Sequence, residues 1–98
     1  MKPTLLKPDE LATALQSLPG WELSGQAMVK RFDFPSYLAG IDFVVQVAKE
    51  AEAMNHHPDL LIGWRKVTAT LSTHSAGGVT ELDLILARKM NDRAASFL

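Results

Sequence analysis

The chain has 98 residues, a length that predicts a single domain spanning residues 1–98. Ten Lys and Arg side chains against eleven Asp and Glu side chains leave a formal charge of −1, so neither nucleic acid nor a membrane surface is an expected partner. No cysteine is present, which excludes disulfides, thiolate metal sites and cysteine nucleophiles. The start, MKPTLLKPDELATAL, lacks the continuous apolar stretch of a signal peptide, and no run is apolar enough to cross a membrane. We therefore expect a cytoplasmic protein.

Residues 7–34 predict a helix followed by a β-hairpin. Pro8 suits the first turn of a helix, the two acidic residues after it complement the positive end of the helix dipole, and Pro19-Gly20 stops the helix. The strands WEL (21–23) and AMVKRFDF (27–34) follow, joined by a short polar turn. Three side chains of the second strand are expected to share one face, namely Met28, Phe32 and Phe34.

Residues 35–54 predict a long helix that is apolar on two sides. One stripe has the three-four spacing of a buried face and consists of Leu38, Ile41, Val45 and Ala48. A second apolar surface consists of Phe43, Val44, Val47 and Ala51. A helix that is apolar on two sides is usually covered on both. We expect the sheet to cover one side and a second subunit to cover the other.

Two more strands, 59–64 and 66–73, and a C-terminal helix complete the pattern. In the second of these strands apolar residues alternate with Thr and Ser, so one face should be buried and the other wet. Thr80-Glu81-Leu82-Asp83 has the form of a capping box, which would start the last helix. The order α-β-β-α-β-β-α predicts an α+β domain, in which three helices pack on one face of a four-stranded antiparallel sheet.

Five polar residues fall at the ends of these elements or in a loop, so the fold could bring them together. Functional residues favour such junctions. They are Glu52, His56, His57, His74 and Asp83. Glu52 precedes His56 by four residues, which puts both on one face if the helix continues. Pro58 disfavours the helical conformation at His57, so the chain should turn there and the two rings can diverge.

Each of these residues also has a purely structural interpretation. His57 can cap the helix end, His74 can be an ordinary surface residue, and Asp83 can serve only the helix dipole. The two tryptophans, Trp21 and Trp64, are most simply core residues.

The combined spacing of these residues resembles the signature of the pterin-4a-carbinolamine dehydratase family, also known as the dimerisation cofactor of a homeodomain transcription factor. The pattern here is Glu52-x3-His56-His57-Pro58-x5-Trp64-x9-His74-x8-Asp83. The GWEL, KRFDF and KVTATLSTH segments are also similar to the family. The resemblance extends from about Pro19 to the C-terminus.

The resemblance implies an enzyme that converts 4a-hydroxytetrahydropterin to quinonoid dihydropterin and water, in the recycling of a tetrahydrobiopterin-type cofactor. The catalytic residues that it implies are His56, His57, His74 and Asp83. The substrate contacts that it implies are Glu52, Pro58, Trp21, Ser72 and Thr73. The pterin would be the substrate, with no metal and no further cofactor, and the assembly would be a homodimer or a tetramer.

Imidazoles suit this chemistry because they titrate near neutrality and can both donate and accept protons. Our hypothesis is that His56 and His74 share the acid and base work and that His57 orients the substrate. Asp83 would hold a histidine, and Glu52 would contact the pterin or polarise His56.

Three other functions stay open at this stage. Three histidines with carboxylates are adequate ligands for zinc or iron, although two adjacent rings do not easily face one ion. A binding module would use the second apolar side of helix 35–54, at Phe43, Val44 and Val47. A related pterin or molybdopterin-linked role without dehydration is the third.

Overall fold

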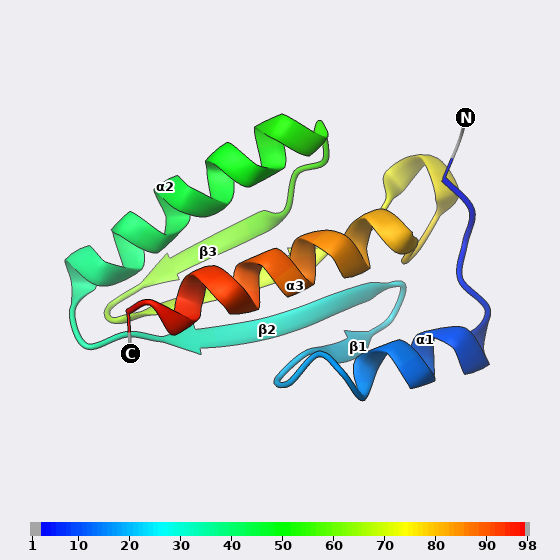
Figure 1. Cartoon of the computed structure of the whole chain (residues 1–98), viewed down its shortest axis with the longest axis horizontal. Helices are drawn as coiled ribbons and strands as arrows, with labels where there is room; N and C mark the ends of the chain where they lie inside the picture. Colours follow the sequence, from blue (N-terminus) through cyan, green and yellow to red (C-terminus); the bar gives the residue numbers. More distant parts are fainter. Residues whose placement is uncertain (1–2, 98) are drawn as a thin grey trace.

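The structure, a computed structural model, describes residues 3–97 and confirms the predicted α+β class and element order (Figure 1). The helices are α1 (Pro8–Leu15), α2 (Tyr37–Met54) and α3 (Glu81–Ala95). The strands are β1 (Glu22–Ser24), β2 (Ala27–Asp33), β3 (Asp59–Gly63) and β4 (Lys66–Leu71). A short 3-10 helix, η1 (His74–Ala76), lies in the loop between β4 and α3. Within the described residues, no helix is both long and apolar enough to span a membrane.

The four strands form one antiparallel sheet in the order β1-β2-β4-β3. The predicted alternation in β4 is confirmed. Val67, Ala69 and Leu71 are buried on one face, while Thr68 and Thr70 are half-buried on the other. In β2, Phe32 lies opposite Val67 and is also buried. Figure 1 shows α2 and α3 lying across one face of this sheet, so this face and the two helices enclose the core.

Helix α1 lies beside β1 at one side of the molecule (Figure 1). Pro8 occupies its first turn, and the amide of Lys7 donates a hydrogen bond to Glu10 Oε1 at 2.9 Å. The helix ends at Leu15, earlier than the Pro19-Gly20 stop that the sequence predicts. The chain continues in turns to Leu18, whose side chain is buried and joins the same core as α2 and α3.

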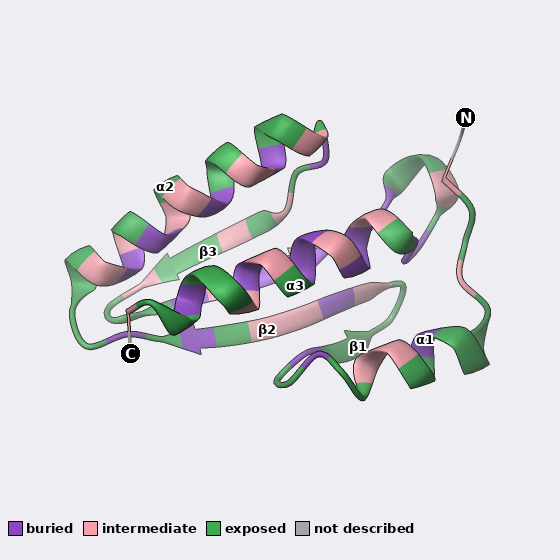
Figure 2. Cartoon of the chain, viewed as in Figure 1, coloured by how far each residue is buried: buried purple, intermediate pink, exposed green. Residues whose placement is uncertain are grey.

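The predicted facing of α2 is wrong, because the stripe with the regular three-four spacing faces outwards (Figure 2). Leu38 is 68 % exposed and Val45 is 49 % exposed, whereas Phe43 and Val47 are fully buried. Aromatic packing favours this orientation. Phe43 packs between the rings of Phe32 and Phe34, with centroids 4.8 and 5.0 Å away.

The capping box predicted at the start of α3 is confirmed. Thr80 is the N-cap, its Oγ1 accepts a hydrogen bond from the amide of Leu82, and its own amide donates to Asp83 Oδ2 at 2.9 Å. Both Thr80 and Asp83 are fully buried. The box therefore fixes a carboxylate inside the protein as well as starting the helix.

Candidate active site

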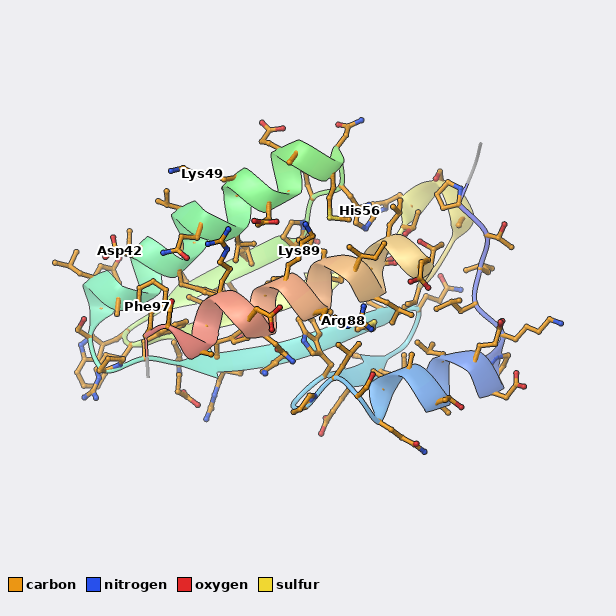
Figure 3. The ribbon with its side chains drawn as sticks, viewed as in Figure 1. Asp42, Lys49, His56, Arg88, Lys89 and Phe97 are labelled. Carbon is orange, nitrogen blue, oxygen red and sulfur yellow. The ribbon has the colours of Figure 1, made fainter. Side chains whose placement is uncertain are left out.

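The C-terminal end of α2 directs His56 towards α3. Asn55 adopts the left-handed conformation, with φ 51° and ψ 43°, and ends the helix after Met54. The amide of His56 then donates back to the carbonyl of Ala51 at 3.0 Å, which is the hydrogen-bond pattern of a Schellman-type helix end. Figure 3 shows His56 between the end of α2 and the first turns of α3.

His56 and Asp83 form a buried pair. The Nε2 of His56 lies 2.6 Å from Asp83 Oδ1, and the two side chains are 10 % and 0 % exposed. The second oxygen of Asp83 accepts two hydrogen bonds, from Thr73 Oγ1 at 2.8 Å and from the amide of Thr80 at 2.9 Å. The carboxylate is thus held from three sides, and the imidazole is held through the carboxylate.

Thr73 belongs to this buried network. Its hydroxyl lies 2.7 Å from that of Thr80, and both side chains are buried. The backbone supports the arrangement, because Thr73 and Gly78 exchange hydrogen bonds across the loop and the amide of Leu6 donates to the carbonyl of Val79. The sequence resemblance implies a substrate contact at Thr73, but its side chain is engaged with Asp83 inside the protein.

The neighbouring ring of His57 lies in a different environment. Its Nε2 is 3.1 Å from Glu52 Oε2, and the two side chains are 54 % and 78 % exposed. The expectation that Glu52 would polarise His56 is therefore wrong in its geometry. The left-handed turn at Asn55 carries His56 off the α2 face that holds Glu52 and leaves His57 there instead.

His74, Ser72 and Pro58 lie at the same end of the sheet as the histidine pair. β3 begins just after Pro58, and β4 runs antiparallel to it and ends just before Ser72. Continuing the β3–β4 register by two residues, from the pair of Asp59 with Thr70, places His57 opposite Ser72. His74 is exposed as the first residue of η1, and within residues 3–97 no hydrogen bond joins it to either neighbouring histidine.

Trp21, for which the sequence resemblance implies a substrate contact, is buried against α3. It is 4 % exposed, and its Nε1 donates to Asn91 Oδ1 at 3.0 Å. Asn91 follows Asp83 by eight residues of α3, or about 12 Å along the helix axis. The same oxygen accepts from Lys30 Nζ, which also donates to the carbonyl of Pro19, and burial lowers the pKa of Lys30. Trp21 thus belongs to a structural cluster that ties β1 and β2 to α3.

Trp64 is not the core residue that the sequence suggests. It is 71 % exposed, in the turn between β3 and β4, with the guanidinium of Arg65 5.1 Å from its ring centroid. Because this turn is at the far end of β3 from His57, Trp64 does not join the histidines.

The described residues do not support the metal-site alternative. Within residues 3–97, no group of three or more His, Asp or Glu side chains is placed to hold a metal ion. His56 pairs with Asp83 in the interior, and His57 pairs with Glu52 at the surface. The two adjacent rings therefore have separate partners.

Two residues that build this site are absent from its sequence-based prediction. Thr80 was recognised as a helix cap, but its contact with Thr73 joins residues from different elements and leaves no local pattern. Asn55 is also absent from that prediction as the residue that ends α2, although asparagine is among the few residues that readily adopt the left-handed conformation at a helix end.

Comparison with known proteins points to one family. Residues 4–93 match the family model described as pterin 4 alpha carbinolamine dehydratase. A Nocardia farcinica protein named "Putative pterin-4-alpha-carbinolamine dehydratase" is 48 % identical over 94 residues, covering 96 % of this chain and 99 % of that one. A Mycolicibacterium smegmatis protein of the same name is 47 % identical over 87 residues, covering 89 % and 93 %. A crystal structure from Brucella melitensis, described as a transcriptional coactivator/pterin dehydratase, is 41 % identical with a TM-score of 0.88, covering 91 % and 97 %.

Proposed function

Because the chain belongs to the pterin-4a-carbinolamine dehydratase family, we propose that it removes water from 4a-hydroxytetrahydropterin in the recycling of a tetrahydrobiopterin-type cofactor. The observation that carries this proposal is the contact of 2.6 Å between His56 Nε2 and Asp83 Oδ1. A histidine that is oriented by a buried carboxylate is well suited to transfer a proton.

The reaction needs one proton to be delivered and one to be removed. The bond between carbon 4a and its hydroxyl oxygen breaks, and a proton on that oxygen lets it leave as water. The adjacent ring nitrogen loses its proton, and its electron pair forms the new double bond to carbon 4a. The net proton count is zero, so an acid and a base working together complete the turnover.

We assign this acid and base work to His56 and His74. His56 is oriented by Asp83, and His74 lies at the same end of the sheet in an exposed position that substrate can reach. His57 would orient the substrate from the surface, with Glu52 fixing its ring. Ser72 and Pro58 would line the approach to His57. The pterin is the substrate, and no metal or further cofactor is part of the proposal.

The rate at which synthetic 4a-hydroxytetrahydropterin disappears tests this proposal. Stopped-flow absorbance should show that the purified protein accelerates dehydration above the spontaneous rate. His74→Ala should lower the acceleration by about 10²-fold or more, the usual contribution of one acid or base. An unaccelerated reaction with the folded wild type would refute the proposed function. A coupled assay with a phenylalanine hydroxylase would then test the recycling role.

We also propose that the chain forms a homodimer or a tetramer through the outer face of α2. This face consists of Leu38, Ile41, Val45 and Ala48, and it repeats every three and four residues as in helices that pair with each other. Leu38 and Val45 are strongly exposed in the single chain. Large apolar side chains gathered along one helix face are typical of an interaction surface.

The charges beside this face favour a second copy of the same chain. Asp42 and Lys49, both exposed and labelled in Figure 3, lie three residues before and four residues after Val45. If two α2 helices pair antiparallel about a twofold axis at Val45, Asp42 of each copy comes to within about 1.5 Å of the level of Lys49 in the other. One interface then contains two opposite-charge pairs, and this complementarity would set the direction of pairing.

A further inference from the structure

We infer that Thr73 and Thr80 are positioning residues that orient His56 through Asp83, so that Nδ1 of His56 is the atom that exchanges a proton with the substrate. This inference rests on the proposed function for the identity of the substrate. The orientation of the ring itself follows from the hydrogen-bond network alone.

The direction of each hydrogen bond in the network can be worked out from the number of hydrogens. An ionised carboxylate only accepts, so Thr73 donates its single hydroxyl hydrogen to Asp83 Oδ2. Thr73 then has no hydrogen left for Thr80. The contact of 2.7 Å between the two hydroxyls is therefore a donation from Thr80 to Thr73. Thr80 Oγ1 also accepts from the amide of Leu82, and its single hydrogen goes to Thr73.

Asp83 is surrounded by hydrogen-bond donors. Its carboxylate accepts from Thr73 and from the backbone amide of Thr80, and it lies in the first turn of α3, at the positive end of the helix dipole. With Asp83 ionised, the contact of 2.6 Å to His56 requires a hydrogen on Nε2. The neutral ring then carries its lone pair on Nδ1.

Nδ1 is the ring nitrogen of His56 that the network leaves without a partner among the described residues. Within residues 3–97 only Nε2 of this ring takes part in a hydrogen bond, and no buried side-chain nitrogen or oxygen atom lacks a partner. A bond-free Nδ1 is therefore not fully enclosed by the described residues, although His56 as a whole is 9 % exposed. His57 differs, because its Nε2 faces the exposed carboxylate of Glu52 and no buried network holds it.

Three substitutions test the positioning role. Thr73→Val removes the hydroxyl with little change of shape, and Thr73→Ser restores a hydroxyl. The control, Thr68→Val, makes the same change at a half-buried position of β4 outside the network. The first measurement is ¹⁵N NMR of the His56 ring in the ligand-free proteins at a pH where the ring is neutral, since the nitrogen shifts distinguish the two tautomers. Circular dichroism verifies that each variant is folded.

In the wild type and in Thr68→Val we expect the hydrogen of His56 on Nε2. In Thr73→Val we expect a mixture of tautomers. We also expect a kcat for dehydration that is about tenfold lower, with KM changed less than twofold, because residues that orient a functional side chain typically contribute 10-fold or more. Thr73→Ser should restore most of kcat. An Nδ1–H tautomer in the wild type would overturn the inference, as would an unchanged kcat in folded Thr73→Val.

The two proposals fail in distinguishable ways. A wild type with the Nε2–H tautomer but no dehydration would refute the proposed function and the role of Nδ1 in it, while the network would still orient the ring. A wild type that dehydrates the substrate but carries the hydrogen on Nδ1 would refute the positioning role alone. If Thr73→Val fails to fold, the wild-type tautomer is the decisive test.

Discussion

His57 Nε2 lies 3.1 Å from Glu52 Oε2 at the surface of α2. The left-handed turn at Asn55 directs the preceding residue, His56, away from this face. Adjacent histidines in one chain therefore have opposite environments. His56 is buried against Asp83, whereas His57 is solvated. A difference of this kind allows two like side chains to take different roles, because burial and partners decide what each imidazole does.

Replacing Asp83 by Asn should damage both activity and stability. The amide keeps the shape of the carboxylate but accepts at only one of its two positions, so an NH2 donor faces either His56 or the two donors from Thr73 and Thr80. We expect kcat for dehydration to fall by about 10²-fold or more and the free energy of unfolding to fall by about 1–3 kcal/mol. Urea unfolding and the stopped-flow assay measure these effects. Asp92→Asn, an exposed change on the same helix, is the control and should alter neither quantity.

Replacing Glu52 by Gln should leave stability nearly unchanged. Both partners of the Glu52–His57 pair are more than half exposed, and exposed ion pairs contribute about 0–1 kcal/mol. If His57 orients the substrate, the variant should raise KM with little effect on kcat. Steady-state kinetics separate the two constants. A large fall in kcat at unchanged KM would assign Glu52 to the chemical step instead.

Reversing one charge on α2 should weaken self-association, and reversing its partner should restore it. Asp42→Lys places like charges opposite each other in the proposed antiparallel pair, whereas Asp42→Lys combined with Lys49→Asp recreates the attraction. Sedimentation velocity at low salt measures the population of oligomers. A wild type that is monomeric at all concentrations would contradict the proposed assembly. The outer face of α2 would then be available to bind a different protein.

The contribution of Glu50 to stability should disappear in acid. Hydrogen bonds from Arg93 and then Lys89 hold the pKa of Glu50 below its ordinary value of 4.5. A carboxyl group whose pKa is lower in the folded state stabilises that state above its unfolded pKa, and this stabilisation is lost as the pH falls through the folded pKa. The difference in melting temperature between the wild type and Glu50→Gln should thus be constant from pH 7 to about 5 and shrink below about 4.5. A difference that grows in acid would contradict this assignment.

Local sequence patterns predicted most of the fold. The period-two alternation in β4 and the capping box at Thr80 depend on neighbouring residues and were both confirmed. The facing of α2 was not predictable in this way, because both of its sides are apolar. The choice depends on the aromatic packing of Phe43 between Phe32 and Phe34, whose side chains come from outside the helix.

The candidate site was predicted less completely for a similar reason. His56 and Asp83 were expected to be close and are in contact, but the assignment of Glu52 to His56 failed at one residue, Asn55. A helical i, i+4 relation holds only while the helix continues, and the left-handed turn shifts the register by one residue. The role of Thr73 depends on contacts across different elements, which sequence spacing does not show.

The most direct test of His56-based dehydration is the rate at which His56→Ala dehydrates synthetic 4a-hydroxytetrahydropterin, compared with the wild type and with Thr68→Val. We expect wild-type acceleration for Thr68→Val, and for His56→Ala a loss of about 10²-fold or more in kcat with the fold retained. A folded His56→Ala protein that dehydrates the substrate at the wild-type rate would contradict it.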